Sequence, residues 1–347
     1  MHHDLEQWIT QVWKDRKRII GASPTGHSGR GIHLGEKNPA IWEVYDMYNG
    51  MPDADSGGSG PSGTSVATFI DQLDSLEKKI ASGAIVQVGS EFVDLQRGEI
   101  SNIKAAPLKK QSRKGKPITL NTATIGNAFV HYASSHDQVT KHRIYINVKV
   151  PNLGEVFREL MSAIWSESCL SSGKVTGPLG KPRADSIVIY LGDGPGRDAV
   201  IEKIRKYYDL NKGKFQAATP KLTVPVKDMP GVATAMEPPS LALVSSGGEF
   251  YGEATPQSFG FYRSQLIFMA LDRTKWDISD KPDPERFEAF KRRTEKYFRQ
   301  AGIDPDRPAE QSDPKAVKPI SAIAITIEGE LDSDGMYKSG TKVHKAK

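Results

Sequence analysis

Polar and apolar residues alternate along residues 143–149, which read Arg-Ile-Tyr-Ile-Asn-Val-Lys. Successive side chains of a strand point to opposite faces, so Arg143, Tyr145, Asn147 and Lys149 would share one face of a sheet. A face that carries cations, a phenol and an amide could bind an anion. An antiparallel sheet with a polar, solvated face is the alternative interpretation. The binding interpretation requires that further cations converge on the same face.

Two later segments could supply such cations. Lys174 begins the next predicted strand, and Lys181, Arg183 and Asp185 lead into an apolar strand at residues 187–191. A basic side chain at the end of a strand is well placed to meet an anionic ligand. Many such residues, however, only form ion pairs at the protein surface.

A third contribution could come from the helix that is predicted to begin after Ser258, a favourable N-cap residue. Arg263 lies four residues after Phe259, on the side of the apolar stripe of this helix. An arginine in that position is either buried with a carboxylate or directed into a pocket. Together the three segments predict a cationic pocket lined by Arg, Lys, Tyr and Asn side chains.

Other arrangements of reactive residues are weaker candidates. Cys169 is the single cysteine, which excludes an intramolecular disulfide, and its place at the end of an apolar stripe predicts a core residue. His131, His136 and His142 fall between two predicted strands, but no carboxylates at metal-ligand spacing accompany them, so we predict no metal site. One of them, such as His131, could act as a general acid, because imidazole titrates near neutral pH.

Charge and hydropathy exclude several classes of protein. The 347 residues include 47 Lys and Arg against 42 Asp and Glu, an excess too small for a general nucleic-acid-binding protein. Basic residues concentrate between Lys104 and Lys116, where RNA or phosphate binding is the alternative to a solvated loop. No run approaches the roughly 18 apolar residues of a membrane span, and the first residues lack a secretory-signal pattern. We therefore expect a cytoplasmic protein that does not cross a membrane.

Hydrophobic periodicity predicts an α+β fold, with a mixed or antiparallel sheet packed against amphipathic helices and long irregular loops. The Pro- and Gly-rich residues 219–252 are expected to be irregular, as in a binding loop or lid. Predicted helices span residues 5–20, 69–80, 153–164, 200–208, 259–269 and 287–298. Predicted strands span residues 84–88, 92–95, 99–103, 143–150, 174–175, 187–191 and 320–327.

Composition divides the chain into three expected regions. Residues 1–82 would form an N-terminal helical region with a Gly/Ser-rich linker at residues 53–65. Residues 83–275 would form the α+β domain that holds the cationic pocket. Residues 276–347 would form a C-terminal helix and an extension.

Several of these segments, in this order, resemble the HopA type III effector family. The resemblance covers roughly residues 120–275, and the Arg-Ala-Asp before the apolar strand makes it moderately specific. Relatives are plant-pathogen effectors delivered by a type III secretion system, or lyases of class V lanthipeptide and thioamitide biosynthesis. The segments that carry the resemblance are residues 143–148, the helix that follows, Lys174-Val175, residues 181–191, residues 219–223 and residues 258–263.

The resemblance implies a phosphothreonine or phosphoserine lyase. Such an enzyme eliminates phosphate from a peptide or protein and leaves a dehydroamino acid, and the reaction needs no metal or cofactor. It does need a base for a weakly acidic α-proton, and a lysine whose pKa is lowered by surrounding cations is suitable. We expect Lys174 or Lys149 as base, Tyr145 or His131 as acid, Arg143, Arg183, Arg263 and Lys181 as phosphate ligands, and Asp185 and Asn147 as orienting residues, Asp185 for Arg183 or Lys174.

The resemblance also bears on partners and localisation. The partner would be a phosphorylated peptide or protein, with a kinase in a biosynthetic setting or a secretion chaperone in an effector setting. An effector would be secreted into a host cell by a type III system. The alternative function is a non-catalytic effector that binds a phosphopeptide or a host protein through the same cationic face, and RNA binding around residues 104–116 is a third hypothesis.

Overall fold

The computed structural model describes residues 1–22, 39–49, 63–136, 138–238, 258–277, 282–310, 325–328 and 342–345. The chain divides into two compact units, one formed by residues 51–237 and the other by residues 1–50 together with residues 238–347. This division differs from the three predicted regions, because the N-terminal and C-terminal helices belong to one unit and the α+β unit ends at Glu237. Most of the predicted Gly/Ser-rich linker at residues 53–65 lies outside the described residues.

The α+β unit is built on an eight-stranded, fully antiparallel sheet with the strand order β2-β1-β5-β7-β8-β6-β10-β9. The prediction of an α+β fold is therefore confirmed, and the sheet is antiparallel. Its strands are β1 (Ile85–Val88), β2 (Glu91–Asp94), β5 (Phe129–Ala133), β6 (His142–Ile146), β7 (Leu170–Thr176), β8 (Ile187–Leu191), β9 (Val224–Pro225) and β10 (Val232–Met236).

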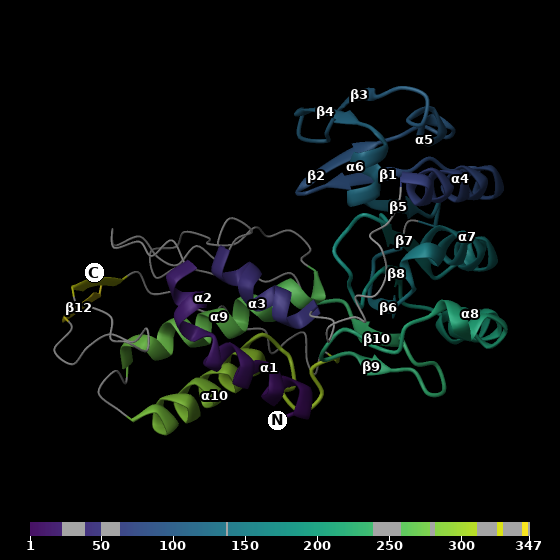
Figure 1. Cartoon of the computed structure of the whole chain (residues 1–347). Coiled ribbons are helices and arrows are strands. Elements are labelled where there is room, and N and C mark those ends of the chain that lie inside the picture. Colours follow the sequence, from purple (N-terminus) through teal and green to yellow (C-terminus); the bar gives the residue numbers. More distant parts are fainter. Residues whose placement is uncertain are drawn as a thin grey trace. The chain divides into compact units, whose positions relative to one another are not determined.

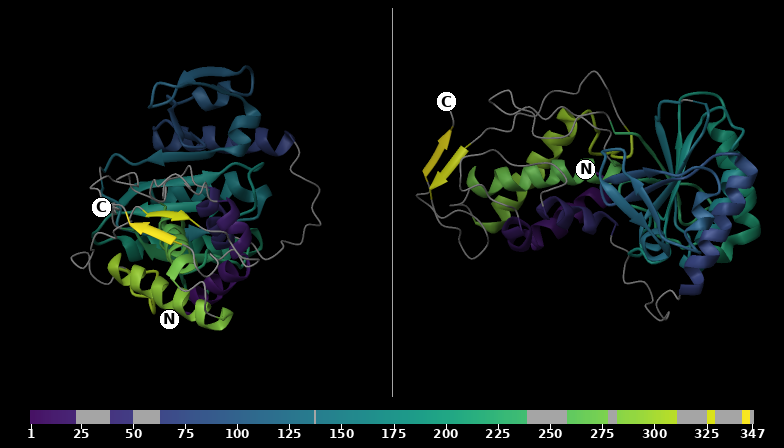
Figure 2. Two further views of the ribbon diagram at one scale, coloured as in Figure 1. Left: turned by 90° about the vertical axis from the view of Figure 1, so that its left-hand side faces the viewer. Right: turned by 90° about the horizontal axis from the view of Figure 1, so that it is seen from above.

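Three helices pack against one face of this sheet (Figures 1 and 2). They are α4 (Gly63–Ile80), α7 (Leu153–Ile164) and α8 (Arg197–Asn211), and they are the helices that periodicity predicts there, although α4 begins earlier. Every residue of the α7 apolar stripe is buried, from Leu153 to Ile164. Because strand side chains alternate, the residues between the buried ones point to the opposite face of the sheet.

The remaining elements of this unit are short. The β3 (Leu108–Gln111) and β4 (Pro117–Leu120) strands form a separate hairpin, and α6 (Thr122–Asn127) follows it. Two 3₁₀ turns span residues 150–152, which include Pro151, and residues 212–214. The β6 strand is consequently shorter than predicted, and Val148 forms only an isolated bridge with Phe215.

Two predicted elements of this unit are wrong. Residues 99–102 form the short helix α5 (Glu99–Asn102) rather than a strand, because Gly98 has a φ of 84° and the Glu99 carboxylate accepts a hydrogen bond from the Gln96 amide. Residues 219–238 are not irregular throughout, since they contain β9 and β10. The β10 strand reads Val-Ala-Thr-Ala-Met, which has too little apolar alternation to stand out, and it is held by its pairing with β6.

The other unit is helical and contains α1 (His3–Lys14), α2 (Arg16–Ala22), α3 (Pro39–Asn49), α9 (Phe259–Asp277) and α10 (Asp283–Gln300). The predicted helix at residues 5–20 is interrupted at Asp15, which caps α1. Trp13 stacks on Phe290 of α10 with ring centroids 5.6 Å apart. A two-stranded sheet pairs β11 (Ile325–Glu328) with β12 (Lys342–Lys345).

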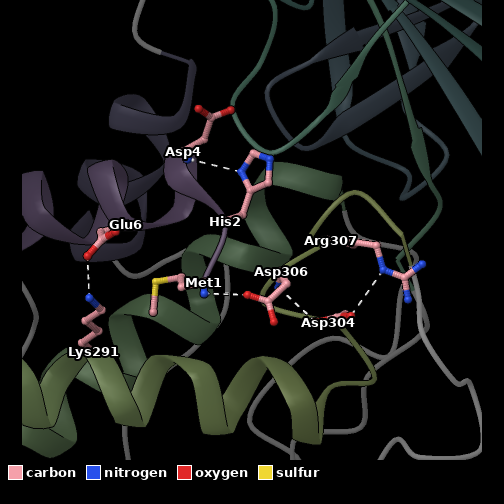
Figure 3. Close-up of polar contacts among 8 residues, drawn as sticks. All are labelled: Met1, His2, Asp4, Glu6, Lys291, Asp304, Asp306 and Arg307. Carbon is pink, nitrogen blue, oxygen red and sulfur yellow. Dashed lines mark hydrogen bonds and ion pairs between the residues drawn. The ribbon is translucent and has the colours of Figure 1, made fainter.

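Ion pairs connect the first residues of the chain to residues near its C-terminal end in this helical unit (Figure 3). The Met1 ammonium group lies 2.5 Å from the Asp306 carboxylate, and Glu6 of α1 pairs with Lys291 of α10 at 2.5 Å. A hydrogen bond from Met1 to Asp306 raises the pKa of the ammonium group and lowers that of the carboxyl group. No described helix of either unit is long and apolar enough to cross a membrane.

Gly177, which follows β7, has a packing requirement that can be tested. A Cβ atom there would lie 2.3 Å from the carbonyl oxygens of both Ile125 and Gly126, so the backbone of α6 must move to admit it. We expect Gly177→Ala to destabilise the protein by about 1–3 kcal/mol through overpacking. The measurement is the urea unfolding midpoint, with Gly213→Ala as a control because a Cβ atom at Gly213 meets nothing within 4 Å. Equal midpoints for the two variants would contradict this account of the turn.

Candidate functional site

The strand register brings four predicted site residues onto the sheet face opposite the helices. His131 of β5 lies directly opposite Lys174 of β7, Lys174 lies opposite Val188 of β8, and Val188 lies opposite Tyr145 of β6. Paired residues of antiparallel strands point to the same face. His131, Lys174 and Tyr145 therefore form one transverse row, and Arg143 lies two residues from Tyr145 on the same face.

Lys174 is held at the centre of this row by aromatic rings. Its Nζ atom lies 4.5 Å from the ring centroid of Phe129 and 5.9 Å from that of Tyr190. Its ammonium group forms no hydrogen bond or ion pair with any residue that the structure describes. A half-buried lysine without a carboxylate partner is available to a ligand, and cation–π contacts orient it without neutralising its charge.

Arg183 and Asp185 form a compact ion pair beside Lys174. The Arg183 Nε and Nη2 atoms donate to the two Asp185 carboxylate oxygens at 2.5 and 3.0 Å, and the guanidinium carbon lies 4.8 Å from the Phe129 ring. Burial by itself would raise the pKa of Asp185, but the charges of Arg183 and Lys174 hold it below its usual value. Asp185 is thus an ionised carboxylate that faces two cations, and Arg183 and Lys174 share the Phe129 ring.

Arg143 is paired in the same way on the other side of Lys174. Its guanidinium group donates through Nε and Nη2 to the Glu237 carboxylate and lies 5.0 Å from the Tyr190 ring. Arg143 is 5% exposed, so this ion pair is desolvated and its geometry is restricted. Burial raises the pKa of the Tyr145 phenol, which is 2% exposed, so this group stays protonated.

His131 faces Lys174 from the neighbouring strand as a neutral imidazole. Its Nε2 atom lies 3.0 Å from the Oε1 atom of Gln87. Burial, together with the smaller effect of the charges of Lys174 and Arg113, lowers the pKa of His131 to about 3. A bound anion with two negative charges would oppose the two cations and raise this pKa.

Three other predicted site residues of this unit have different surroundings. Lys149 is exposed beyond the end of β6, and Lys181 is exposed in the loop before β8. Asn147 is 1% exposed, and its Nδ2 atom donates to the carbonyl oxygen of Ala218 at 2.8 Å. Asn147 therefore stabilises the chain at the end of β6. Lys149 does not lie in the transverse row that contains Lys174.

Arg263 belongs to the helical unit and is buried there. Its Nε atom donates to the carbonyl oxygen of Pro308 at 3.0 Å, its Nη1 atom donates to that of Phe259 at 3.1 Å, and only 2% of the residue is exposed. The α9 helix is buried on all sides from Phe259 to Asp272, so backbone carbonyl groups satisfy this arginine. This placement does not support the prediction that Arg263 binds phosphate, and we leave it out of the site.

Three residues of the site were not identified from the sequence. Glu237 lies 94 positions after Arg143 and just beyond a strand that was not predicted. Phe129 lies in β5, a strand that was not predicted either, whereas Tyr190 belongs to the predicted strand at residues 187–191. Nothing in the sequence shows that both rings contact the same lysine.

Cys169 and the turn before α8 lie outside this cluster. Cys169 is buried and free, as expected of a core residue, and the described residues contain no group of three or more His, Cys, Asp and Glu side chains that could hold a metal. Gly192–Gly196 forms a turn before α8 and lines a polar cavity of about 200 Å³ with His142 and Arg197. The His142 Nε2 atom of this lining lies 3.6 Å from the Asp193 Oδ1 atom.

Comparison with known proteins agrees with the fold. Residues 125–310 match the model of the HopA1 effector protein family, which is more than half of the chain, so the chain belongs to this family. The members of this family are type III effectors, which are secreted into host cells. No match was found among curated protein sequences.

Two solved structures from Pseudomonas syringae share this fold. The effector protein of pathovar syringae strain 61 is 15% identical with a TM-score of 0.54, and the match covers 90% of this chain and 99% of that one. The effector protein of pathovar tomato strain DC3000 is 18% identical with a TM-score of 0.50, and the match covers 88% and 100%. The plasmid virulence C protein of Salmonella, SpvC, is 16% identical over 59% of this chain and 99% of its own, with a TM-score of 0.27.

The charge of Lys174 provides a direct test of the His131 environment. We expect Lys174→Met to raise the pKa of His131, because one of the two nearby positive charges that lower it is removed. NMR titration of the His131 ring protons measures this shift, with Lys206→Met as a control at an exposed site on α8. An unchanged pKa in Lys174→Met would show that the two side chains are not neighbours.

The same histidine should make the protein less stable in acid. Between pH 6.5 and pH 3 the unfolded chain binds a proton at His131 and the folded chain does not, so unfolding becomes more favourable as the pH falls. The limit for one such group is about 1.4 kcal/mol per pH unit. We expect His131→Gln to lose less stability than the native protein between pH 7 and pH 4.5, measured by urea unfolding at both pH values. Parallel losses in the two proteins would contradict the burial of a neutral imidazole.

Proposed function

We propose that this protein is a lyase that eliminates phosphate from phosphothreonine or phosphoserine in a peptide or protein. The observation that carries the proposal is the unpartnered ammonium group of Lys174, flanked by two arginine–carboxylate pairs and directly opposite His131. The family resemblance implies this chemistry, and the cluster contains the groups that it requires. The partner would be a phosphorylated host protein, as expected for an effector.

Lys174 would act as the base. In its unprotonated form, Nζ takes the α-proton of the phosphorylated residue, and the electron pair of that C–H bond forms the Cα=Cβ double bond. The Cβ–O bond breaks, and its electron pair leaves with the phosphate. Lys149, the alternative base, is exposed beyond the strand end and has neither the aromatic contacts nor the neighbouring cations of Lys174.

Arg143 and Arg183 would hold the phosphate group. Glu237 and Asp185 restrict the two guanidinium groups to fixed positions, so little reorganisation is needed when charge develops on the leaving oxygen. Arginine also presents a planar set of donors that suits phosphate oxygens. Of the two cations considered for Asp185, the hydrogen bonds favour Arg183 as the residue that it orients.

His131 is favoured over Tyr145 as the proton donor to the leaving phosphate. His131 lies on the strand next to Lys174 and is partly exposed, whereas Tyr145 lies two strands away and is almost completely buried. The imidazole is neutral in the free protein, and a bound phosphate dianion would raise its pKa so that it can carry the proton. The products are a dehydroamino acid in the peptide and inorganic phosphate.

Mass spectrometry of a phosphothreonine peptide incubated with the full-length protein tests this proposal. We expect a loss of phosphoric acid from the peptide and release of inorganic phosphate. Lys174→Ala should lower the rate at least 100-fold, since a positioned base contributes about 10²–10⁴. Lys149→Ala is the matched control and should retain the native rate.

Two outcomes would contradict the proposal. Full activity in Lys174→Ala would show that another residue is the base. Binding of the phosphopeptide by the native protein without loss of phosphoric acid would favour a recognition module that uses the same cationic face.

A further inference from the structure

A basic hairpin lies at one edge of the α+β unit. We use this name for residues 104–120, which contain β3, β4 and the turn between them. The hairpin has six Lys and Arg residues, and no Asp or Glu occurs between Glu99 and Asp137. Its positive charge is therefore not balanced by acidic residues within the hairpin itself.

Three of its cations are paired with carboxylates outside the hairpin. Lys104 pairs with Asp71, Lys110 pairs with Glu99 at 2.7 Å, and Arg113 pairs with Asp94. The other three, Lys109, Lys114 and Lys116, are exposed, and their ammonium groups form no ion pair with any described residue. These three lysines give this edge of the α+β unit an excess of positive charge.

Hydrogen bonds join the turn of the hairpin to β2, at a position in the same transverse row of residues as Lys174. The amide of Arg113 donates to the carbonyl oxygen of Phe92 on β2 at 2.7 Å, and its Nε atom donates to Asp94 at 2.9 Å. Asp94 lies opposite Ile85, and Ile85 lies opposite His131. The attachment point is thus in the same transverse row, two strands from His131 and three from Lys174.

Neighbouring strands are about 4.8 Å apart, so the attachment point is roughly 14 Å from Lys174 along the sheet. An extended peptide covers about 3.3 Å per residue, which corresponds to about four residues. A substrate that places its phosphorylated residue at Lys174 and follows the row would reach the hairpin with residues about three to six positions away.

We propose that Lys109, Lys114 and Lys116 bind acidic side chains of the substrate, about three to six residues from the phosphorylated residue. This proposal rests on the proposed function, because it takes Lys174 as the reacting position. The hairpin would then select substrates by charge and would not take part in the elimination itself.

The hairpin fits an acidic peptide better than RNA. Residues 104–120 contain no aromatic side chain, and proteins that bind single-stranded RNA usually stack bases on aromatic rings. The hairpin is also in line with the site to which a polypeptide would bind. Charge complementarity with carboxylates needs only exposed ammonium groups at the right distance.

The experiment compares three phosphothreonine peptides of equal length. One is neutral apart from the phosphate, and the other two carry three Glu residues, placed three to six positions on the N-terminal or the C-terminal side. We expect the native protein to process one acidic peptide with a kcat/KM roughly tenfold above that of the neutral peptide, as three exposed ion pairs allow. The advantage should disappear in Lys109→Gln/Lys114→Gln/Lys116→Gln, with no change for the neutral peptide.

The matched control is Lys206→Gln/Lys212→Gln/Lys227→Gln, which removes the same charge from exposed sites elsewhere in the unit and should keep the preference. Fluorescence anisotropy with the unphosphorylated acidic peptides measures binding independently of elimination, so failure of the lyase activity can be told from failure of this proposal. Equal affinity of the native protein and the hairpin variant for these peptides would overturn it. Loss of binding to an oligouridylate in that variant, with peptide preference unchanged, would assign the hairpin to RNA instead.

Discussion

The antiparallel pairing of β7 with β5 and β8 determines the surroundings of Lys174. Because paired residues share a face, this register places His131 on one side of the lysine and directs the rings of Phe129 and Tyr190 toward its ammonium group. A shift of one residue would turn Lys174 into the apolar core beneath the helices, where an unpaired charge is very unfavourable. The stability of the core and the composition of the site therefore depend on the same hydrogen bonds.

Charge balance around Lys174 follows a simple pattern. Arg143 and Arg183 each have a carboxylate partner, so burial of these cations is compensated, whereas the Lys174 ammonium group lies against aromatic rings and forms no ion pair with a described residue. The cluster as a whole keeps one positive charge that no described carboxylate pairs with. An anionic ligand would complete it, and this is the physical basis for the proposal of a phosphorylated substrate.

The sequence predicts much of the fold and part of the site. The apolar stripe of α7 and the continuous apolar run of β8 are strong local signals, and both elements occur as predicted. The alternation along β6 correctly predicts that Arg143 and Tyr145 share a face. Prediction failed for β10 and for the helix α5, because the first depends on pairing with β6 and the second on the backbone of Gly98.

Side-chain type and spacing in the sequence alone determined that Lys174, Arg143 and Arg183 would occupy strands or strand ends, and which of them alternate with core residues. Only the tertiary structure decided which cations lie together. Lys149 follows the same alternation but extends beyond the ladder, and Arg263 has the expected helix position but donates to backbone carbonyls in the other unit. Periodicity predicts the direction of a side chain relative to its own helix or strand. Which side chains of different strands come together depends on strand order and register, and contacts between distant segments determine both.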